Sequence, residues 1–262
     1  MKRRALNLLG RLGLLRPAFR AYERARAAFA PASPPADDGL PVPPARLIVR
    51  VAGTPDAAWF LESGRGGAEA IRAALARAGR PVEGLAAMLD FGCGCGRVTR
   101  RWAGLDGTAV HGSDQSAEAV EWCRRNLPFA RFATNRLEPP VPYDGETFDL
   151  VYALSVFTHL PEELQLAWAR ELGRVVKPGG FLLLTVHGER YRDRLTEAER
   201  GRFDAGRLVV RWEEGAGSNL CSAFHPPSYV KERLAAPFEL VDFVPEGATG
   251  NPHQDLYLLT RP

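Results

Sequence analysis

The sequence predicts a doubly wound α/β fold, in which helices cover both faces of a mainly parallel sheet. Amphipathic helical patterns alternate with short apolar runs along most of the chain, as is typical of parallel strands joined by crossover helices. The runs lack polar alternation, which indicates strands buried on both faces. At 262 residues and 45% hydrophobic content, the chain can bury one substantial core.

The first apolar run, residues 85–89, leads into a glycine-rich turn and then a helix expected over 97–103. Glycine accepts a positive φ and lets a ligand lie directly on the backbone. The free N–H groups of a following helix suit a carboxylate or phosphate. A dinucleotide fingerprint would place its third glycine at 97, where this chain has Arg97. The turn therefore predicts a ligand site, with a dinucleotide site or a plain tight turn as alternatives.

The pattern D-x-G-x-G-x-G, from Asp90 to Gly96, resembles the first motif of class I S-adenosylmethionine (SAM)-dependent methyltransferases. Residues 148–160 (FDLVYALSVFTHL) and 172–185 (LGRVVKPGGFLLLT) resemble the fourth and later motifs of small-molecule members. The resemblance covers about residues 85–187. It implies a seven-stranded sheet of order 3-2-1-4-5-7-6 with the seventh strand antiparallel. It also implies that the turn holds the amino-acid end of SAM, through Asp90, Gly92, Cys93, Gly94 and Gly96.

A second acidic residue strengthens the cofactor prediction. Asp114 follows the next expected strand, residues 108–112, and stands 18 positions beyond Gly96. A ribose diol needs an acceptor at the carboxyl end of that strand. We therefore predict that Asp114 and its neighbour Gln115 bind the cofactor. Ser116 or Asp114 is expected to cap a helix over 117–126.

The next two strands supply the remaining predicted cofactor residues. Asn135 follows the expected third strand, 129–133, and the resemblance places the adenine edge there, with Arg136 beside it. An Asx turn is the alternative role for Asn135. Ser155, in the polar turn after the fourth strand, completes the predicted set.

The C-terminal half is expected to finish the sheet and carry an insertion. A helix should begin at residues 161–163 and stop at Lys177-Pro178-Gly179-Gly180, before a fifth strand over 181–186. Residues 188–226 mix seven arginines and seven acids with aromatic side chains, and we predict a lid or acceptor-binding element suited to a sugar or an anion. The last helix is expected over 227–234, and the last strands over 238–244 and 255–260.

The N-terminal region, residues 1–45, is predicted to be a basic helical segment followed by a proline-rich linker over 31–45, with the methyltransferase domain over 46–262. Residues 1–30 carry eight basic residues against Glu23, while the rest of the chain is mildly acidic. An apolar stripe from Leu8 to Tyr22, bent or divided at Pro17, predicts either a helix packed on the body or a partner, or an anchor on anionic lipid.

Two further helices, over 55–63 and 68–78 and divided by the glycines of 64–67, should precede the first strand and cover one side of the cofactor cleft. Trp59 and Phe60 are expected in the core there, with stacking on a ligand as the alternative.

Methyl transfer from a sulfonium mainly requires the protein to align the acceptor with the methyl carbon and to exclude water. A base is therefore useful only for an acceptor that must lose a proton. His159, just past the fourth strand, is the predicted base or acceptor contact, and helix initiation is its alternative role. His187 and His225 are second choices. His111 is expected to be structural, and His253 to lie in a loop. No histidine spacing matches a metal motif, so no metal is predicted.

These observations predict a SAM-dependent methyltransferase that acts on a small-molecule or glycan-like acceptor and releases S-adenosylhomocysteine, with O- and N-methylation both open. The alternatives are a non-catalytic SAM-binding subunit and, less favoured, an NAD-type oxidoreductase. The acidic body argues against a nucleic-acid partner. The four cysteines show no disulfide or zinc spacing, so a cytoplasmic location is expected, with possible membrane contact at the inner face through residues 1–30.

Overall fold

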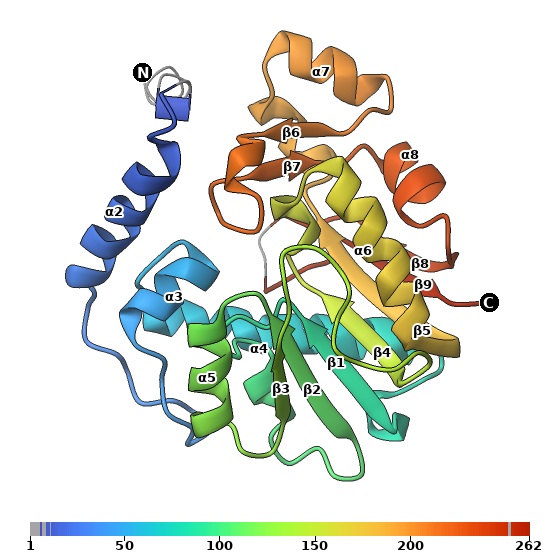
Figure 1. The fold of residues 1–262 in the computed structure, drawn as a ribbon. Coiled ribbons are helices and arrows are strands. Elements are labelled where there is room, and N and C mark those ends of the chain that lie inside the picture. The colour runs from blue at the N-terminus through green and yellow to red at the C-terminus, as the bar shows by residue number, and fades with distance from the viewer. Residues whose placement is uncertain (1–5, 7–8, 11, 251–252) are drawn as a thin grey trace.

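The computed structural model describes residues 6, 9–10, 12–250 and 253–262. Its main sheet has seven strands in the order β3-β2-β1-β4-β5-β9-β8 (Figure 1). The strands are β1 Ala87–Phe91, β2 Ala109–Asp114, β3 Arg131–Thr134, β4 Phe148–Ala153, β5 Val176–Val186, β8 Glu239–Val244 and β9 Asp255–Thr260. β9 pairs antiparallel with both neighbours, whereas the pairs from β3 to β5 are parallel. The predicted fold class and strand order are confirmed.

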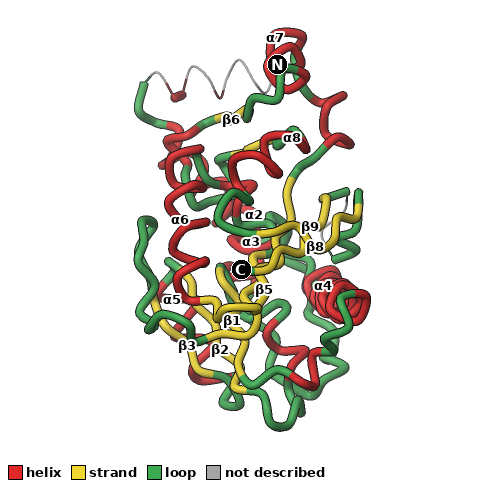
Figure 2. Tube along the Cα trace, turned by 90° about the vertical axis from the view of Figure 1, so that its right-hand side faces the viewer, coloured by secondary structure: helices red, strands yellow, loops and turns green. Residues whose placement is uncertain are grey.

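Helices cover both faces of this sheet, with α4 on one side of the strands and α6 on the other (Figure 2). The described helices are α2 Leu15–Ala28, α3 Ala45–Ala52, α4 Ala57–Arg77, α5 Ala117–Asn126, α6 Glu162–Val175, α7 Glu197–Asp204 and α8 Pro227–Tyr229. Successive residues of a strand point to opposite faces. Accordingly, Leu150 of β4 lies in the cluster with Ile71 of α4, and Val151 lies in the cluster with Trp168 of α6.

The prediction of two helices divided at residues 64–67 is wrong, because α4 runs through these glycines without a break. A Cβ on Gly64 would collide with the carbonyl oxygen of Arg97, and one on Gly66 would lie 3.2 Å from the amide nitrogen of Gly250. The glycines therefore let neighbouring backbone approach the helix and do not end it.

Several predicted boundaries also differ from the structure. β1 and β2 each extend two residues further, so Asp90 lies within β1. The helix expected after the glycine turn is only a 3₁₀ turn, Thr99–Trp102, whose Thr99 hydroxyl donates to Asp90. The Lys-Pro-Gly-Gly stretch belongs to β5, which begins directly after α6.

The predicted insertion forms a small unit of its own. It contains a 3₁₀ turn, Glu189–Arg194, then α7, and then an antiparallel hairpin of β6 Val209–Arg211 and β7 Ser222–Phe224, which makes a separate two-stranded sheet. Figure 1 shows this unit beyond one end of the main strands, next to α6 and α8. Its role as a lid stays a prediction.

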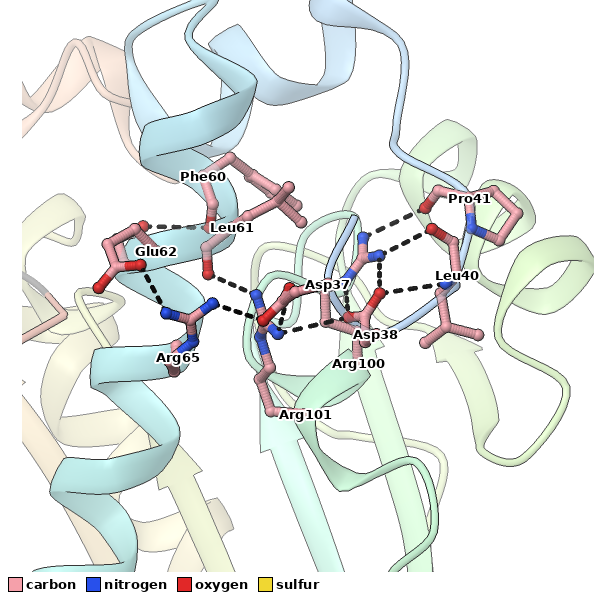
Figure 3. Close-up of polar contacts among 11 residues, drawn as sticks. Asp37, Asp38, Leu40, Pro41, Phe60, Leu61, Glu62, Arg65, Arg100 and Arg101 are labelled. Atoms are coloured by element: carbon pink, nitrogen blue, oxygen red, sulfur yellow. Dashed lines mark hydrogen bonds and ion pairs between the residues drawn. The ribbon is translucent and has the colours of Figure 1, made fainter. Parts of the chain in front are cut away.

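The N-terminal region packs on the rest of the chain. α2 begins at Leu15, with Pro17 in its first turn, and contacts α3. In the linker, the Asp38 carboxylate accepts two hydrogen bonds from the Arg100 guanidinium, at 2.6 and 2.7 Å, and Asp37 pairs with Arg101 at 2.8 Å (Figure 3).

Several residues of the predicted basic and apolar stripe lie outside the described residues: Lys2, Arg3, Arg4, Leu8 and Arg11. Among the helices that are described, none is both long and apolar enough to cross a membrane.

Candidate active site

A cavity of about 1200 Å³ lies at the carboxyl ends of β1, β2 and β4. The sheet order reverses direction between β1 and β4, and open α/β sheets bind ligands at this point. The volume exceeds the roughly 300–1,000 Å³ of a pocket for one drug-sized ligand. The cavity therefore has room for a cofactor and an acceptor together.

Nearly all of the predicted cofactor residues line this cavity: Asp90, Gly92, Cys93, Gly94, Asp114, Gln115, Asn135, Arg136 and Ser155. Gly96 does not. It has φ +78°, and a Cβ there would collide with the side chain of Leu127 behind the turn. Gly96 thus allows the turn to pack on the core and is not placed to contact a ligand.

Asp114 joins the end of β2 to the glycine turn. Its Oδ2 accepts a 2.9 Å hydrogen bond from the Gly94 amide, and its Oδ1 accepts one of 2.7 Å from the Ser116 amide. Ser116 in turn caps α5 through the amide of Ala119. Burial raises the pKa of Asp114, and the two amide hydrogen bonds partly oppose this shift by lowering the pKa. Two fixed donors therefore orient a carboxylate that still has acceptor capacity toward the cavity.

Asp90 is the second carboxylate of the turn, and it is almost completely buried. Burial raises its pKa to about 6, although hydrogen bonds from the side chains of Thr99 and Tyr152 and the charge of Arg97 oppose this shift. Arg97 itself lies 6.0 Å from the ring centroid of Trp59, which also lines the cavity. Trp59 is thus available to a ligand, whereas Phe60 is fully buried, as expected.

Asn135 and Gln115 form the wall at the β2–β3 end. The Asn135 amide nitrogen donates to the Arg136 carbonyl at 2.6 Å, and its Oδ1 is buried without a partner in the described structure. An Asx turn would use that oxygen, so the alternative role is excluded. Gln115 donates to the carbonyl of Gly217 and so ties β2 to the insertion.

Ser155 is held by a closed ring of hydrogen bonds. Its amide donates to the Thr185 hydroxyl at 2.8 Å, which donates to Oε1 of Gln254 at 2.7 Å. The Gln254 amide nitrogen completes the ring by donating to the Ser155 hydroxyl at 2.8 Å. Ser155 has φ +62°, an uncommon backbone conformation that this ring stabilises at the cavity wall.

His159 lines the cavity, and its environment selects one tautomer. Its Nδ1 lies 2.8 Å from the carbonyl oxygen of Cys221. Because a carbonyl only accepts, Nδ1 carries the proton and the neutral ring keeps an acceptor lone pair on Nε2. Burial lowers the pKa of His159, and the Cys221 hydrogen bond partly opposes this effect. The residue is therefore a neutral imidazole with a free basic nitrogen.

The other histidines have different surroundings. His187 and His225 do not line the cavity, and burial lowers the pKa of each to about 3. His111 lies in β2 between the rings of Tyr143 and Phe148. His253, in the turn before β9, lines the cavity and contacts Glu246 at 2.7 Å.

Sequence reasoning missed the part of the cavity wall that α2, α3 and the residue before β9 supply. These residues are Arg16, Phe19, Arg20, Glu23 and Arg24 of α2, Arg50 and Val51 of α3, and Gln254. The predicted insertion supplies Tyr191, Arg194, Gly217, Ser218, Asn219 and Leu220, which were not singled out as site residues. The apolar stripe of α2 did predict a packed helix, but no local pattern shows which distant segment it meets.

No group of three or more metal-binding side chains occurs in the part of the chain that the structure describes. All four cysteines are buried free thiols.

The family model described as a methyltransferase domain matches residues 88–180, which run from β1 through the glycine turn and α6 into β5. "Methyltransferase GfsG" of Streptomyces halstedii is 31% identical over 107 residues, covering 37% of this chain and 36% of that protein. "Malonyl-[acyl-carrier protein] O-methyltransferase" of Salmonella typhimurium is 33% identical over 101 residues, covering 38% of this chain and 39% of that protein. The chain thus spans well under half the length of these relatives.

Two solved structures are similar to this chain in fold. The PH0226 protein of Pyrococcus horikoshii has a TM-score of 0.56 and 16% identity, covering 76% of this chain and 91% of that one. The glycopeptide N-methyltransferase MtfA in complex with SAM has a TM-score of 0.54 and 16% identity, covering 75% and 94%.

Proposed function

We propose that this protein is a class I SAM-dependent methyltransferase, which transfers a methyl group from SAM to a small-molecule acceptor, and the methyltransferase-domain match over residues 88–180 supports this. One observation carries the proposal: a half-buried carboxylate, Asp114, is hydrogen-bonded to the Gly94 amide on the wall of a cavity large enough for two ligands. A helix-capping role alone would not require that carboxylate to face a cavity.

The residues present fit this cofactor. The remaining lone pairs of Asp114 suit the two hydroxyls of a ribose. The unpartnered Oδ1 of Asn135 suits the amino group of an adenine, because an N–H donor would satisfy it. Asp90, with its pKa near 6, and the bare backbone of Gly92 and Gly94 suit the amino-acid end. Cys93, Gln115, Arg136 and Ser155 complete the proposed cofactor wall.

SAM supplies an activated methyl group, so the chain's own residues mainly orient the acceptor and exclude water. The insertion helps to enclose the cavity. The Gly217 carbonyl accepts a hydrogen bond from the Gln115 side chain, and the Gly217 amide donates to the His159 carbonyl at 2.8 Å. Where the acceptor is a hydroxyl or an ammonium, we propose that Nε2 of His159 takes its proton.

One relative is named for O-methylation of malonyl-acyl carrier protein and one structural neighbour for N-methylation of a glycopeptide. A small or glycan-like acceptor is consistent with the cavity volume.

We also propose peripheral membrane contact through residues 1–30. Leu12, Leu14, Tyr22 and Phe29 are exposed apolar side chains in a strongly basic segment, a combination that suits anionic lipid. Sedimentation with phosphatidylserine vesicles should recover the full chain at low salt and not a chain that lacks residues 1–30. Equal recovery of both would contradict this contact.

Isothermal titration calorimetry with SAM, S-adenosylhomocysteine and NAD tests the cofactor. We expect binding of the first two and none of NAD. Binding of NAD alone would overturn the proposal in favour of an oxidoreductase. Production of S-adenosylhomocysteine from SAM in a cell extract, absent in an Asp114→Ala variant, would separate the enzyme from a non-catalytic SAM-binding subunit.

A further inference from the structure

The charges that line the cavity are strongly unbalanced. The positive side chains are Arg16, Arg20, Arg24, Arg46, Arg50, Arg97, Arg136 and Arg194, whereas the carboxylates are Glu23, Asp90, Asp114 and Glu118. Two of those carboxylates belong to the proposed cofactor wall. Glu118 is neutralised by Arg46 and Arg50, at 2.7 and 2.6 Å. Arg136 belongs to the same cofactor wall and Arg97 acts on Asp90, so the charges outside the cofactor residues are those of Arg16, Arg20, Arg24 and Arg194 against Glu23.

Arg194 marks the end of the cavity opposite to the proposed adenine and ribose contacts. The strands follow one another across the sheet as β3, β2, β1, β4 and β5. Asn135 follows β3 and Asp114 ends β2, whereas Arg194 lies in the segment after β5. A cofactor held by the first two residues leaves the Arg194 end for the acceptor.

The side chain of Arg194 is oriented by an aromatic ring and has no counter-ion among the described residues. Its guanidinium lies 4.7 Å from the ring centroid of Tyr191, which itself lies 4.1 Å from that of His187. In the same 3₁₀ turn, Arg190 and Arg192 pair with Glu246 and Asp204. Of the described carboxylates, none forms an ion pair with Arg194. Stacking on Tyr191 fixes the plane of the guanidinium and leaves its N–H donors available.

A second positive element lies on the other side of the cavity. Arg16 and Arg20 of α2 line it, and Arg16 donates to the backbone carbonyl of Glu214 in the insertion, which keeps its charge unneutralised. α2 and the insertion thus both contribute arginines to the cavity wall.

We propose that the methyl acceptor carries an anionic group, a phosphate or a carboxylate, and that Arg194 stacked on Tyr191 is its main binding residue. A planar guanidinium matches both anions with two parallel N–H···O bonds. The inference rests on the proposed function, because that function assigns the other end of the cavity to SAM.

The test is calorimetry on the full chain saturated with S-adenosylhomocysteine, so that any arginine needed for the cofactor carboxylate is already occupied. Pyrophosphate and citrate are the probes, and a preference between them distinguishes phosphate from carboxylate acceptors. We expect Arg194→Gln to weaken probe binding about 10- to 100-fold, as expected for loss of a charge-assisted hydrogen bond. Affinity for S-adenosylhomocysteine should not change.

Arg190→Gln is the matched control, because it removes the same charge from the same turn at a side chain that does not line the cavity. It should leave probe binding unchanged. Undiminished binding in Arg194→Gln, or an equal loss in Arg190→Gln, would overturn the inference in favour of diffuse attraction. Failure of S-adenosylhomocysteine to bind any variant would instead overturn the proposed function.

Discussion

The amide of Gly94 donates a 2.9 Å hydrogen bond to Oδ2 of Asp114, and this contact joins the glycine turn after β1 to the end of β2. If the same carboxylate binds the cofactor, Asp114→Ala should weaken the binding of S-adenosylhomocysteine by about 1–3 kcal/mol, the cost of losing a hydrogen-bonded acceptor. Calorimetry measures this difference directly.

Two controls refine that test. Asp114→Asn keeps one acceptor oxygen and should bind with intermediate affinity. Asp106→Ala removes an exposed carboxylate outside the cavity wall and should bind normally. Unchanged affinity in a folded Asp114→Ala protein would remove Asp114 from the cofactor site.

The doubly wound α/β class, the glycine turn and the position of Asp114 were predictable because they depend on local sequence, whereas the strand order and the adenine contact were implied by the resemblance to SAM-dependent methyltransferases. A strand, a turn and a helix follow one another along the chain, so Asp114 and Asn135 could be placed at strand ends before any contact was known. The contribution of α2 and α3 was not predictable, because it depends on packing between segments far apart in sequence. Val51 of α3, for example, lies where a Cβ on Gly94 would be.

The continuity of α4 through its glycines was also not predictable, because it depends on packing against distant segments. It leads to a prediction about stability. In an exposed helix, glycine to alanine usually stabilises by about 1 kcal/mol. Gly64→Ala should do the opposite and destabilise by about 1–3 kcal/mol or more, since its Cβ would meet the Arg97 carbonyl and α4 or the glycine turn would have to move. Urea unfolding of the wild type and of Gly64→Ala measures this change in the free energy of unfolding.

Gly201 of α7 is the matched control, because nothing lies within 4 Å of a Cβ built there. Gly201→Ala should stabilise the protein by about 0.5–1 kcal/mol. Stabilisation by both substitutions would show that the α4 glycines serve no close packing.

His159 is expected to act on the acceptor. If Nε2 removes a proton, His159→Ala should lower kcat by about 10² to 10⁴ and leave cofactor affinity nearly constant. Because burial lowers its pKa, the wild-type rate should be level at neutral pH and fall only below about 6.5, as the imidazole gains its proton.

His159→Asn separates chemistry from structure, since its amide nitrogen lies near the position of Nδ1 and can still donate to the Cys221 carbonyl, but it cannot take up a proton. Normal turnover in this variant would assign His159 a structural role and direct attention to His253 and the insertion.

Acid should destabilise the fold through His225. Its Nε2 lies 3.1 Å from Oε1 of Gln165, whose amide nitrogen donates to the carbonyls of Phe157 and Leu160. Burial lowers the pKa of His225 to about 3, so it stays neutral in the folded protein, whereas the unfolded chain takes up a proton near 6.5. Stability should therefore fall below pH 6.5, with a limiting slope of about 1.4 kcal/mol per pH unit from this residue.

The measurement is urea unfolding at several pH values between about 7 and about 5. His225→Phe removes the titrating group, so its stability should depend less steeply on pH than that of the wild type, although its stability at neutral pH also changes. His187, with a pKa of about 3, should supply most of the remaining histidine slope. Parallel slopes for the two proteins would show that His225 is not neutral in the folded state.

Figure 3 shows two ion pairs of the linker, one with a fully buried arginine and a mostly buried carboxylate and one whose carboxylate is half-exposed. The Arg100 side chain is 0% exposed and donates to Asp38 and to the carbonyls of Leu40 and Pro41. Asp38→Ala should cost about 3–5 kcal/mol in urea unfolding, because it leaves a buried guanidinium without its counter-charge. Asp37→Ala, which removes a half-exposed partner of Arg101, should cost at most about 1 kcal/mol. If the two variants lost equal stability, Arg100 would not depend on Asp38, and the linker would be held mainly by its apolar contacts.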